Sequence, residues 1–358
     1  MLTNLTVQNF TVFPGQRFEF GKNLNIIVGE NGAGKSHILK AAYSAIAVGA
    51  VRGKSGPEAP NKAHLQTALA EKLQAVFRPD GLGRLVRRAK GRSKTRLTYG
   101  FDDSALNLAY TFSTVARNEV KISATPRKRQ ANLPIFLPTR ELLTIAPGFV
   151  ALYETTHLPF EETWRDTCIL LEAPLAKGPR ERHIKELLVP LESAMGGKVV
   201  VDRRGRFYLK LPSGYMEMHL VAEGLRKLAM VARLIATGSL LDKGYLFWDE
   251  PESNLNPRMI RTVARTIMQI AASGVQVFIA THSLFLLREL HILQQRDFPD
   301  FDTRCFGLHL EKEGVVSVQQ GPTMDDIGSI AALDEDLAQS DRYFDVEMGL
   351  NPETEGAE

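Results

Sequence analysis

The sequence predicts an α/β fold with a mainly parallel sheet, to which an antiparallel β subdomain and a helical lobe are added. The last third alternates short apolar segments with amphipathic ones, a pattern that places helices over a parallel sheet. Residues 97–124 instead alternate polar and apolar side chains, as antiparallel strands do. From 139 to 241 the apolar spacing is mostly helical, with a short β interruption at 198–210.

Taken in chain order, the expected elements begin with two or three strands between residues 2 and 28 and a glycine-rich turn. Helices follow at 35–48 and 63–77. Between them, residues 52–62 are rich in glycine, proline and lysine, so we expect a mobile loop there. The later elements are strands at 135–137, 245–248, 275–280, 305–310 and 315–318, and helices at 258–272 and 284–290.

Composition excludes several classes of protein. Of the 358 residues, 44% are hydrophobic and 24% charged, which rules out a wholly disordered chain and a fibrous repeat. Two cysteines are too few for a secreted disulfide framework. The net charge of +3 conceals a split, because residues 321–358 hold eleven acids and one base. This tail carries −10 and leaves +13 for residues 1–320.

Residues 29–36, GENGAGKS, fit the phosphate-loop pattern G-x-x-x-x-G-K-S between an apolar strand and a helix start. Backbone N–H groups of such a turn surround a phosphate, and glycines are needed because side chains would block the approach. We expect Lys35 to reach the β- and γ-phosphates of a nucleotide and Ser36 to bind Mg²⁺. A plain tight turn that caps a helix is the alternative, which the strand–turn–helix context disfavours.

A second motif ends the apolar segment 245–248 with two acids, Asp249 and Glu250, before Pro251 stops the strand. Open α/β sheets bind their ligands at the carboxyl ends of the strands. We expect Asp249 to hold Mg²⁺ through water and Glu250 to polarise the attacking water. Taken alone, the two acids also fit a solvated strand end. The phosphate loop upstream favours the catalytic interpretation.

With both motifs in place, the chain resembles the ABC-type ATPases, specifically the ATP-binding proteins of the AAA family related to RecF, chromosome-maintenance and OLD-like ATPases. Residues 253–257 (SNLNP) follow the two acids as the family's D-loop does. His282 ends the next strand, where the family has its switch histidine. Residues 222–227 (AEGLRK) open a helix and resemble the signature motif. The resemblance covers 1–50 and 215–320 well, and the stretch between only in general organisation.

This resemblance implies a P-loop NTPase fold of the ABC-ATPase type, with ATP and Mg²⁺ as cofactors. The implied catalytic residues are Lys35, Glu250 and His282, of which the histidine would hydrogen-bond the γ-phosphate. The implied Mg²⁺ ligands are Ser36 and Asp249. Glu141, near the Q-loop position, is a weaker candidate. The alternative for that segment is a helix that has Thr139 as its N-cap. The expected ATP contacts are Asn31, Gly32, Ala33, Gly34, Lys35, Ser36, His37, Glu223, Gly224 and Asn254.

In ABC proteins the signature motif binds the γ-phosphate held by the opposite subunit, so the resemblance implies a homodimer joined by two ATP molecules. The signature serine is replaced here by Ala222, and losing one hydrogen bond to a charged group costs about 1.5–3 kcal/mol. The implied parts of the chain are a first ATPase half with the β subdomain and a basic insert (1–138), a helical lobe with the signature-like motif (139–243), a second ATPase half (244–320) and an acidic tail (321–358).

A strongly basic segment with eight basic residues and one acid runs from Arg78 to Arg96, and a second cluster lies at 127–129. Such segments can neutralise nucleic-acid phosphates. The candidate contacts are Arg84, Arg87, Arg88, Lys90 and Arg92. A solvated loop, or an intramolecular partner for the acidic tail, is the alternative. No signal-peptide pattern opens the chain, and its most apolar helical stretch contains three basic residues, so we expect a cytoplasmic protein without a membrane span.

The leading hypothesis is a Mg²⁺-dependent ATPase that dimerises around ATP and switches a nucleic-acid- or effector-associated complex, in DNA repair or anti-phage defence. The alternative is a slow ATP sensor that restrains a separately encoded nuclease or toxin, which Ala222 favours. The ATP-binding subunit of a membrane transporter is a weaker hypothesis, because such subunits usually keep the signature serine and a Q-loop glutamine.

Overall fold

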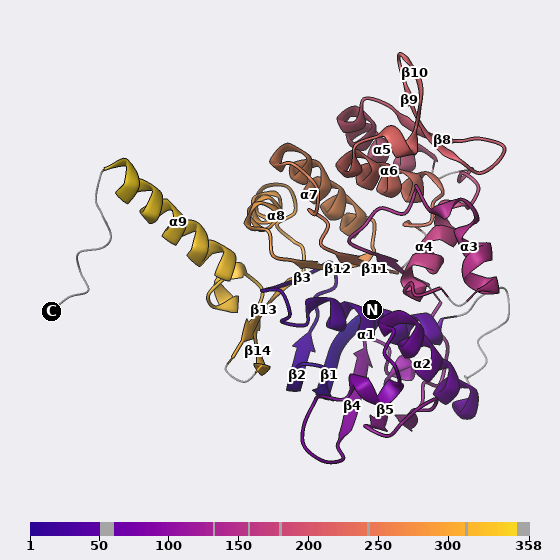
Figure 1. The fold of residues 1–358 in the computed structure, drawn as a ribbon, viewed down its shortest axis with the longest axis vertical. Coiled ribbons are helices and arrows are strands. Elements are labelled where there is room, and N and C mark those ends of the chain that lie inside the picture. The colour runs from indigo at the N-terminus through magenta and orange to yellow at the C-terminus, as the bar shows by residue number, and fades with distance from the viewer. Residues whose placement is uncertain are drawn as a thin grey trace.

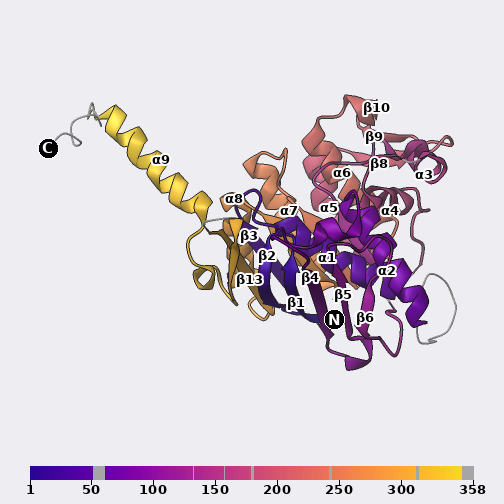
Figure 2. The ribbon, with the colours of Figure 1, turned by 60° about the horizontal axis from the view of Figure 1, so that its bottom comes forward.

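The computed structural model describes residues 1–50, 61–131, 133–156, 158–178, 181–241, 244–311 and 314–348. Two large sheets and a group of helices form the body, and one helix projects from it (Figures 1 and 2). Most of the expected mobile loop at 52–62 lies outside the described residues. The rest of that segment, Asn61 and Lys62, starts a helix, where the Asn61 side chain accepts hydrogen bonds from the first turn.

The larger sheet is mainly parallel, as the sequence predicts. In spatial order its strands are β14 (Val316–Gly321), β13 (Thr303–Leu310), β3 (Leu24–Gly29), β12 (Gln276–Thr281), β11 (Tyr245–Asp249) and β7 (Pro134–Leu137). Only the edge strand β14 runs antiparallel to its neighbour. Val28 near the end of β3 pairs with Thr281 of β12, so the segments that follow the central strands start at one edge.

The second sheet is antiparallel and forms the expected β subdomain, in the order β2 (Phe13–Glu19), β1 (Leu2–Phe10), β4 (Lys94–Phe101), β5 (Leu108–Ser113) and β6 (Lys121–Ala124). Helix α1 (Lys35–Gly49) lies between the two sheets, beside α2 (Lys62–Phe77). The parallel strands are apolar on both faces, as strands covered on both sides must be. Phe247 packs toward α1, whereas its neighbours Leu246 and Trp248 pack into the opposite core.

That opposite core joins the sheet to the helical lobe. The helices are α3 (Ala146–Thr155), α4 (Glu162–Leu171), α5 (Glu181–Met195), α6 (Glu223–Ala236), α7 (Pro257–Ala272) and α8 (Leu284–Asp297). The β interruption expected at 198–210 is a small antiparallel sheet that extends further, with β8 (Lys198–Val201), β9 (Phe207–Leu211) and β10 (Gly214–Glu217). Short 3-10 turns lie at η1 (Leu82–Leu85), η2 (Ser104–Leu106), η3 (Met218–Leu220) and η5 (Met324–Ile327).

The acidic tail is structured through Glu347. Its first part belongs to the body, since Ile327 is fully buried and its carbonyl lies 2.8 Å from His309 Nε2 on β13. Helix α9 (Ala331–Glu347) then projects from the body, as both ribbon views show (Figures 1 and 2). Among the described helices, none combines the length and the apolar character that a membrane crossing requires.

Candidate functional site

The phosphate loop connects β3 to α1. Gly32 and Gly34 adopt φ values of 87° and 91°, a region that favours glycine. A Cβ on Gly34 would also lie 2.7 Å from Val12 Cγ2 and 2.8 Å from the Phe13 ring, so the loop requires glycine there for two reasons. The Lys35 ammonium donates to the carbonyls of Gly29 (2.7 Å) and Glu30 (3.2 Å). The Lys35 side chain therefore lies against the loop, where its ammonium group can bind an anion.

Asp249 ends the fully buried strand β11 and faces the loop from the adjacent part of the sheet. Burial raises the pKa of Asp249, and a hydrogen bond from the Ser36 hydroxyl partly opposes that rise. Within the described residues Asp249 Oδ1 is buried without a hydrogen-bond partner. Mg²⁺ prefers oxygen ligands such as carboxylates and hydroxyls. The Asp249 oxygen that accepts no hydrogen bond, together with the neighbouring Ser36 hydroxyl, supplies such ligands. Ser36 and Asp249 therefore fit the expected metal.

Glu250 follows immediately, with a left-handed φ of 48° that is uncommon outside glycine. One of its carboxylate oxygens lies 2.7 Å from His282 Nδ1, and the other lies 3.6 Å from the Lys35 ammonium. Burial opposes ionisation of Glu250, but hydrogen bonds from Glu252 and His282 and the neighbouring positive charges hold its pKa below the ordinary value. The structure thus brings all three predicted catalytic residues together.

These groups surround a cavity of about 290 Å³. Its lining residues are Glu30, Asn31, Gly32, Gly34, Lys35, Ser36, His37, Thr139, Asp249 and Glu250. Ala33 is buried and does not line it. Burial, and secondarily the charge of Lys40, lowers the pKa of His37 to about 4, so its ring is neutral at pH 7. Most of the predicted phosphate contacts therefore lie around one cavity.

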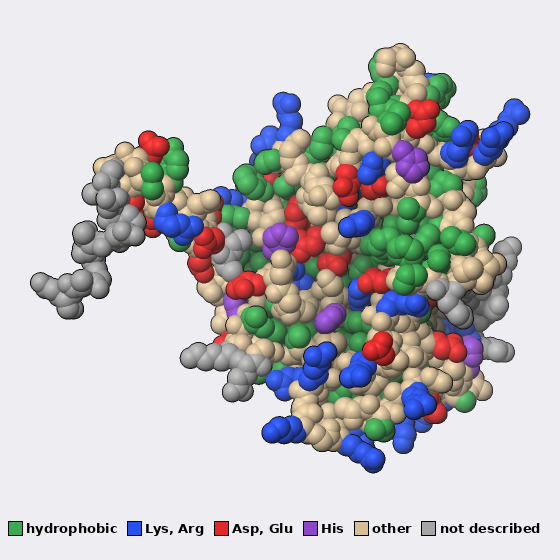
Figure 3. Space-filling view, viewed as in Figure 1, with side chains coloured by type: hydrophobic (Ala, Val, Ile, Leu, Met, Phe, Trp, Pro, Cys, Tyr) green, Lys and Arg blue, Asp and Glu red, His purple; other side chains and the backbone are tan. Residues whose placement is uncertain are grey.

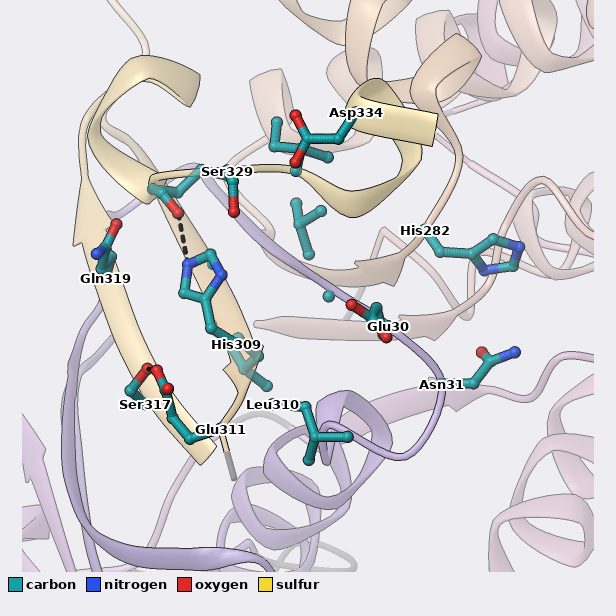
Figure 4. Close-up of a pocket in the computed structure, with 16 residues that line it drawn as sticks. Glu30, Asn31, His282, His309, Leu310, Glu311, Ser317, Gln319, Ser329 and Asp334 are labelled. Atoms are coloured by element: carbon teal, nitrogen blue, oxygen red, sulfur yellow. Dashed lines mark hydrogen bonds between the residues drawn. The ribbon is translucent and has the colours of Figure 1, made fainter. Parts of the chain in front are cut away.

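A larger cavity of about 730 Å³ adjoins the phosphate loop (Figure 4). Glu30, Asn31 and His282 line one side, whereas His309 and Asp334 belong to the opposite side, formed by β13, β14 and the start of α9. The groups suited to phosphate and metal chemistry line the smaller cavity. The larger one lies beside it on the same edge of the sheet.

Glu141, the weaker candidate for a metal ligand, does not line the phosphate cavity. It is buried, and its carboxylate lies 2.8 Å from Arg226 Nε on α6 and accepts a hydrogen bond from the Thr144 hydroxyl. From the segment after β7 it is Thr139 that reaches the cavity. The sequence could not distinguish these positions, because both follow the same short strand.

The signature-like residues lie apart from the phosphate cavity of their own chain. Ala222 is the N-cap of α6 and supplies no side-chain hydrogen bond to the helix. Glu223 and Gly224 begin this helix beside the D-loop, and a Cβ on Gly224 would lie 2.5 Å from the carbonyl oxygen of Asn254. Asn254 is exposed and has a left-handed φ of 62°. None of these residues lines the cavity that holds Lys35.

Two buried residues at the site were not predicted from the sequence. Glu252 is 6% exposed and accepts a hydrogen bond of 2.5 Å from the Thr281 hydroxyl. Burial, together with the adjacent Glu250 carboxyl, raises its pKa to about 7. Ligand atoms of Glu250, Glu252 and His282 lie within 4.8 Å of one another, and among the described residues one carboxylate oxygen of each glutamate is buried without a hydrogen-bond partner. The sequence signal of Glu252 was a third acid, three residues after the end of the strand.

Lys227 is the other unpredicted residue. It lies on α6, is 2% exposed and donates a 2.5 Å hydrogen bond to the backbone carbonyl of Glu250. Its only sequence signal was a cation in an otherwise apolar helix face.

The candidate nucleic-acid contacts lie elsewhere, on η1 and in the segment between η1 and β4 of the antiparallel sheet. Arg84, Arg88, Lys90 and Arg92 are exposed, and Arg87 is half-buried. Lys and Arg side chains are frequent on the lower part of the molecule in Figure 3, where this sheet lies. Arg84 also lines a surface hollow of about 580 Å³ together with Arg117. These side chains form a basic surface separate from the phosphate cavity.

Comparisons with known proteins agree with this geometry. Residues 178–288 match the family described as "AAA domain, putative AbiEii toxin, Type IV TA system", and residues 4–71 match a second AAA-domain family. The first match contains α6, β11 and His282, and the second contains the phosphate loop.

Relatives match over shorter stretches. The DNA replication and repair protein RecF of Francisella tularensis subsp. novicida is 45% identical over 42 residues, 12% of either chain. The octopine permease ATP-binding protein P of Rhizobium meliloti is 28% identical over 142 residues, 39% of this chain and 46% of that protein. The chain thus spans about an eighth of the RecF length and under half of the permease protein.

Solved structures match over most of the chain. An SMC head bound to the C-terminal winged-helix domain of ScpA has a TM-score of 0.54 and 14% identity, covering 90% of this chain and 98% of the other. An SMC head with an extended coiled coil, bound to the C-terminal domain of ScpA derived from Pyrococcus furiosus, has a TM-score of 0.52 and 12% identity over 96% and 99%. Two segments of the chain thus resemble AAA-domain families, and its fold resembles that of SMC heads.

Proposed function

We propose that this protein is a Mg²⁺-dependent ATPase that dimerises around ATP and uses binding and hydrolysis to switch a nucleic-acid- or effector-associated complex. The observation that carries the proposal is the convergence of Lys35, Ser36, Asp249 and Glu250 on one cavity at the carboxyl edge of the parallel sheet. The family matches support ATP chemistry in general. DNA repair and anti-phage defence are the roles that we propose for it.

The residues divide the chemistry between them. Lys35 and the loop N–H groups bind the phosphates, while Ser36 and Asp249 would hold Mg²⁺, which would supply positive charge next to the transferred phosphoryl group. Glu250 is ionised at neutral pH because its pKa is low, so it can accept a proton from water. His282, with a side chain 57% exposed, orients that carboxylate through the 2.7 Å contact and can reach a γ-phosphate.

Dimerisation is supported by the position of α6. Its first residues, Glu223 and Gly224, lie outside the phosphate cavity of their own chain. The N-terminus of a 14-residue helix presents free N–H groups and a partial positive charge, which suit an anion held by a second copy. The basic surface between η1 and β4 supports nucleic acid as one component of the complex.

Three measurements test the proposal. The wild-type protein should hydrolyse ATP in the presence of Mg²⁺, and Lys35→Ala should bind little nucleotide. Glu250→Gln should bind ATP, lose about 10²–10⁴-fold in turnover and accumulate as a dimer in light scattering after size exclusion. A Glu250→Gln protein that stays monomeric in saturating Mg-ATP would refute the ATP-joined dimer.

A slow ATP sensor that restrains a separate nuclease or toxin is the second candidate. Ala222 favours it, because the N-cap position of α6 lacks the hydroxyl that would bind the partner's phosphate. Ala222→Ser should then tighten the ATP-dependent dimer and raise turnover. If nucleic acid stimulates hydrolysis by the wild type, the first candidate is favoured, whereas unstimulated turnover far below about 1 s⁻¹, the low end for enzymes, favours the sensor.

A further inference from the structure

Lys227 connects three separate segments of the chain. From α6 its ammonium reaches the carbonyl of Glu250 at 2.5 Å and the hydroxyl of Ser253 in the D-loop. The Ser253 hydroxyl in turn donates to the carbonyl of Thr139 at 3.0 Å. Glu250 and Ser253 follow β11, whereas Thr139 follows the neighbouring strand β7. One side chain of the signature helix thereby links the segments after two adjacent strands.

Burying the charged Lys227 side chain lowers the free energy of unfolding. Burial lowers the pKa of Lys227 to about 8, even though Glu252, Glu250, Asp249 and Glu223 favour its charged form. An apolar side chain would avoid that penalty in a helix whose neighbouring residues Leu228 and Ala229 are fully buried. The positive charge instead has a specific environment: the carboxylate at the end of β11 and two carboxylates of the turn that follows favour it, and two backbone oxygens lie within reach.

The backbone of Glu250 is held from both sides. Its N–H donates to the carbonyl of Ala280 on β12 at 2.9 Å, and its own carbonyl accepts from Lys227. Between these two contacts the residue keeps a φ of 48°, a conformation that surrounding structure must enforce for a glutamate. The direction of the Glu250 side chain toward His282 and Lys35 depends on this backbone conformation.

We propose that Lys227 is a positioning residue, which holds the Glu250 backbone from the signature helix and so couples the position of α6 to the geometry of the hydrolytic carboxylate. The inference rests on the proposed ATP hydrolysis and deepens it. Lys227 does not line the phosphate cavity, and the loop residues that bind phosphate have their own supports. Its loss should therefore impair turnover far more than ATP binding.

The test compares three variants. Lys227→Met keeps the length and apolar stem of the side chain and removes its charge and donors. Lys227→Arg keeps both charge and donors. Arg233→Met is the matched control, because Arg233 is a buried cation on the same helix that also donates to backbone carbonyls, those of Leu171 and Ala173, but within the helical lobe. Each variant is assayed for equilibrium ATP binding, kcat and amide hydrogen exchange over residues 250–256.

Lys227→Met should bind ATP within about threefold of the wild type and lose about tenfold to a hundredfold in kcat, the usual effect of misplacing a catalytic group by about 1 Å. Its amides at 250–256 should exchange faster. Lys227→Arg should recover part of the kcat, and Arg233→Met should keep the wild-type kcat and exchange in this segment. Wild-type kcat and exchange in Lys227→Met would overturn the inference, as would equal losses in both methionine variants.

The exchange measurement separates this inference from the function on which it rests. If the wild type bound ATP without hydrolysing it, the proposed activity would fail. Faster exchange at 250–256 in Lys227→Met alone would still show that Lys227 holds this turn, and unchanged exchange would reject it.

Discussion

Gly224→Ala probes the contact between the signature helix and the D-loop. A Cβ on Gly224 would lie 2.5 Å from the carbonyl oxygen of Asn254, so the two backbones would have to separate by about 0.9 Å to reach an ordinary 3.4 Å contact. The obstacle is a backbone atom, which cannot rotate away as a side chain can. The alanine keeps the N–H group at this position, so any effect comes from the added methyl group.

Forcing a methyl group into a packed contact costs about 1–3 kcal/mol, and the smaller entropy of the unfolded chain returns about 0.4–1 kcal/mol. We therefore expect a net loss of about 1–2 kcal/mol in the free energy of unfolding, measured by urea denaturation. ATP hydrolysis should slow as well, because α6 would be moved away from the turn that carries Glu250. Binding of ATP to the isolated monomer should persist, since Gly224 does not line the phosphate cavity.

Gly15→Ala provides the matched control. Gly15 lies exposed in β2, and a Cβ there would have no neighbouring atom within 4 Å. The control should be as stable as the wild type or slightly more stable. If Gly224→Ala behaved like Gly15→Ala in both stability and hydrolysis, the close approach of α6 to the D-loop would be refuted.

Two further predictions concern charge. Burial and Glu250 raise the pKa of Glu252 from its ordinary 4.5 to about 7. Between these pH values the folded state therefore retains a proton that the unfolded chain releases. The contribution of Glu252 to the free energy of unfolding is thus present below pH 4.5 and is lost as the pH rises to about 7. Glu252→Gln should flatten that dependence in urea titrations between pH 4.5 and 8, and a variant with the wild-type slope would contradict it. On the basic surface, replacing Arg88, Lys90 and Arg92 by glutamate should weaken nucleic-acid binding and reduce the slope of log K against log salt by about 0.9 for each phosphate that the protein no longer neutralises. An unchanged slope in filter-binding or anisotropy titrations would place the nucleic-acid contacts elsewhere.

The local motifs were predictable because each is a continuous segment with strict conformational needs. The glycines at 32 and 34 have the positive φ values that a phosphate loop requires, and α1 begins at Lys35 as the pattern indicates. The two acids of the second motif end a buried strand and reach the same cavity. Proximity in sequence to an apolar strand was sufficient for these predictions, since the strand fixes where its last residues point.

Other features depended on segments distant in sequence. Glu141 and Thr139 follow the same strand, and only the position of Arg226 on α6 shows that the glutamate is paired away from the cavity. The tail, which the sequence marks only as an acidic segment, keeps η5 against β13 and continues as α9. Periodicity could not predict that Ile327 is buried, because its partner His309 lies on a strand 18 residues earlier.

By itself, the sequence determined the class of fold, the phosphate loop and the pair of acids, because strand and helix periodicity and glycine conformations act over a few residues. Only the tertiary structure decided which polar groups from distant parts of the chain form hydrogen bonds with one another. Lys227 lies 23 residues before Glu250, and Thr281 lies 29 residues after Glu252, yet both pairs are in hydrogen-bond contact. Burial among these partners, which no local pattern specifies, raises the pKa of one carboxyl group, while the hydrogen bonds and positive charges around its neighbour lower the other. The fold thereby keeps Glu250 ionised while its neighbour Glu252 retains its proton up to about pH 7.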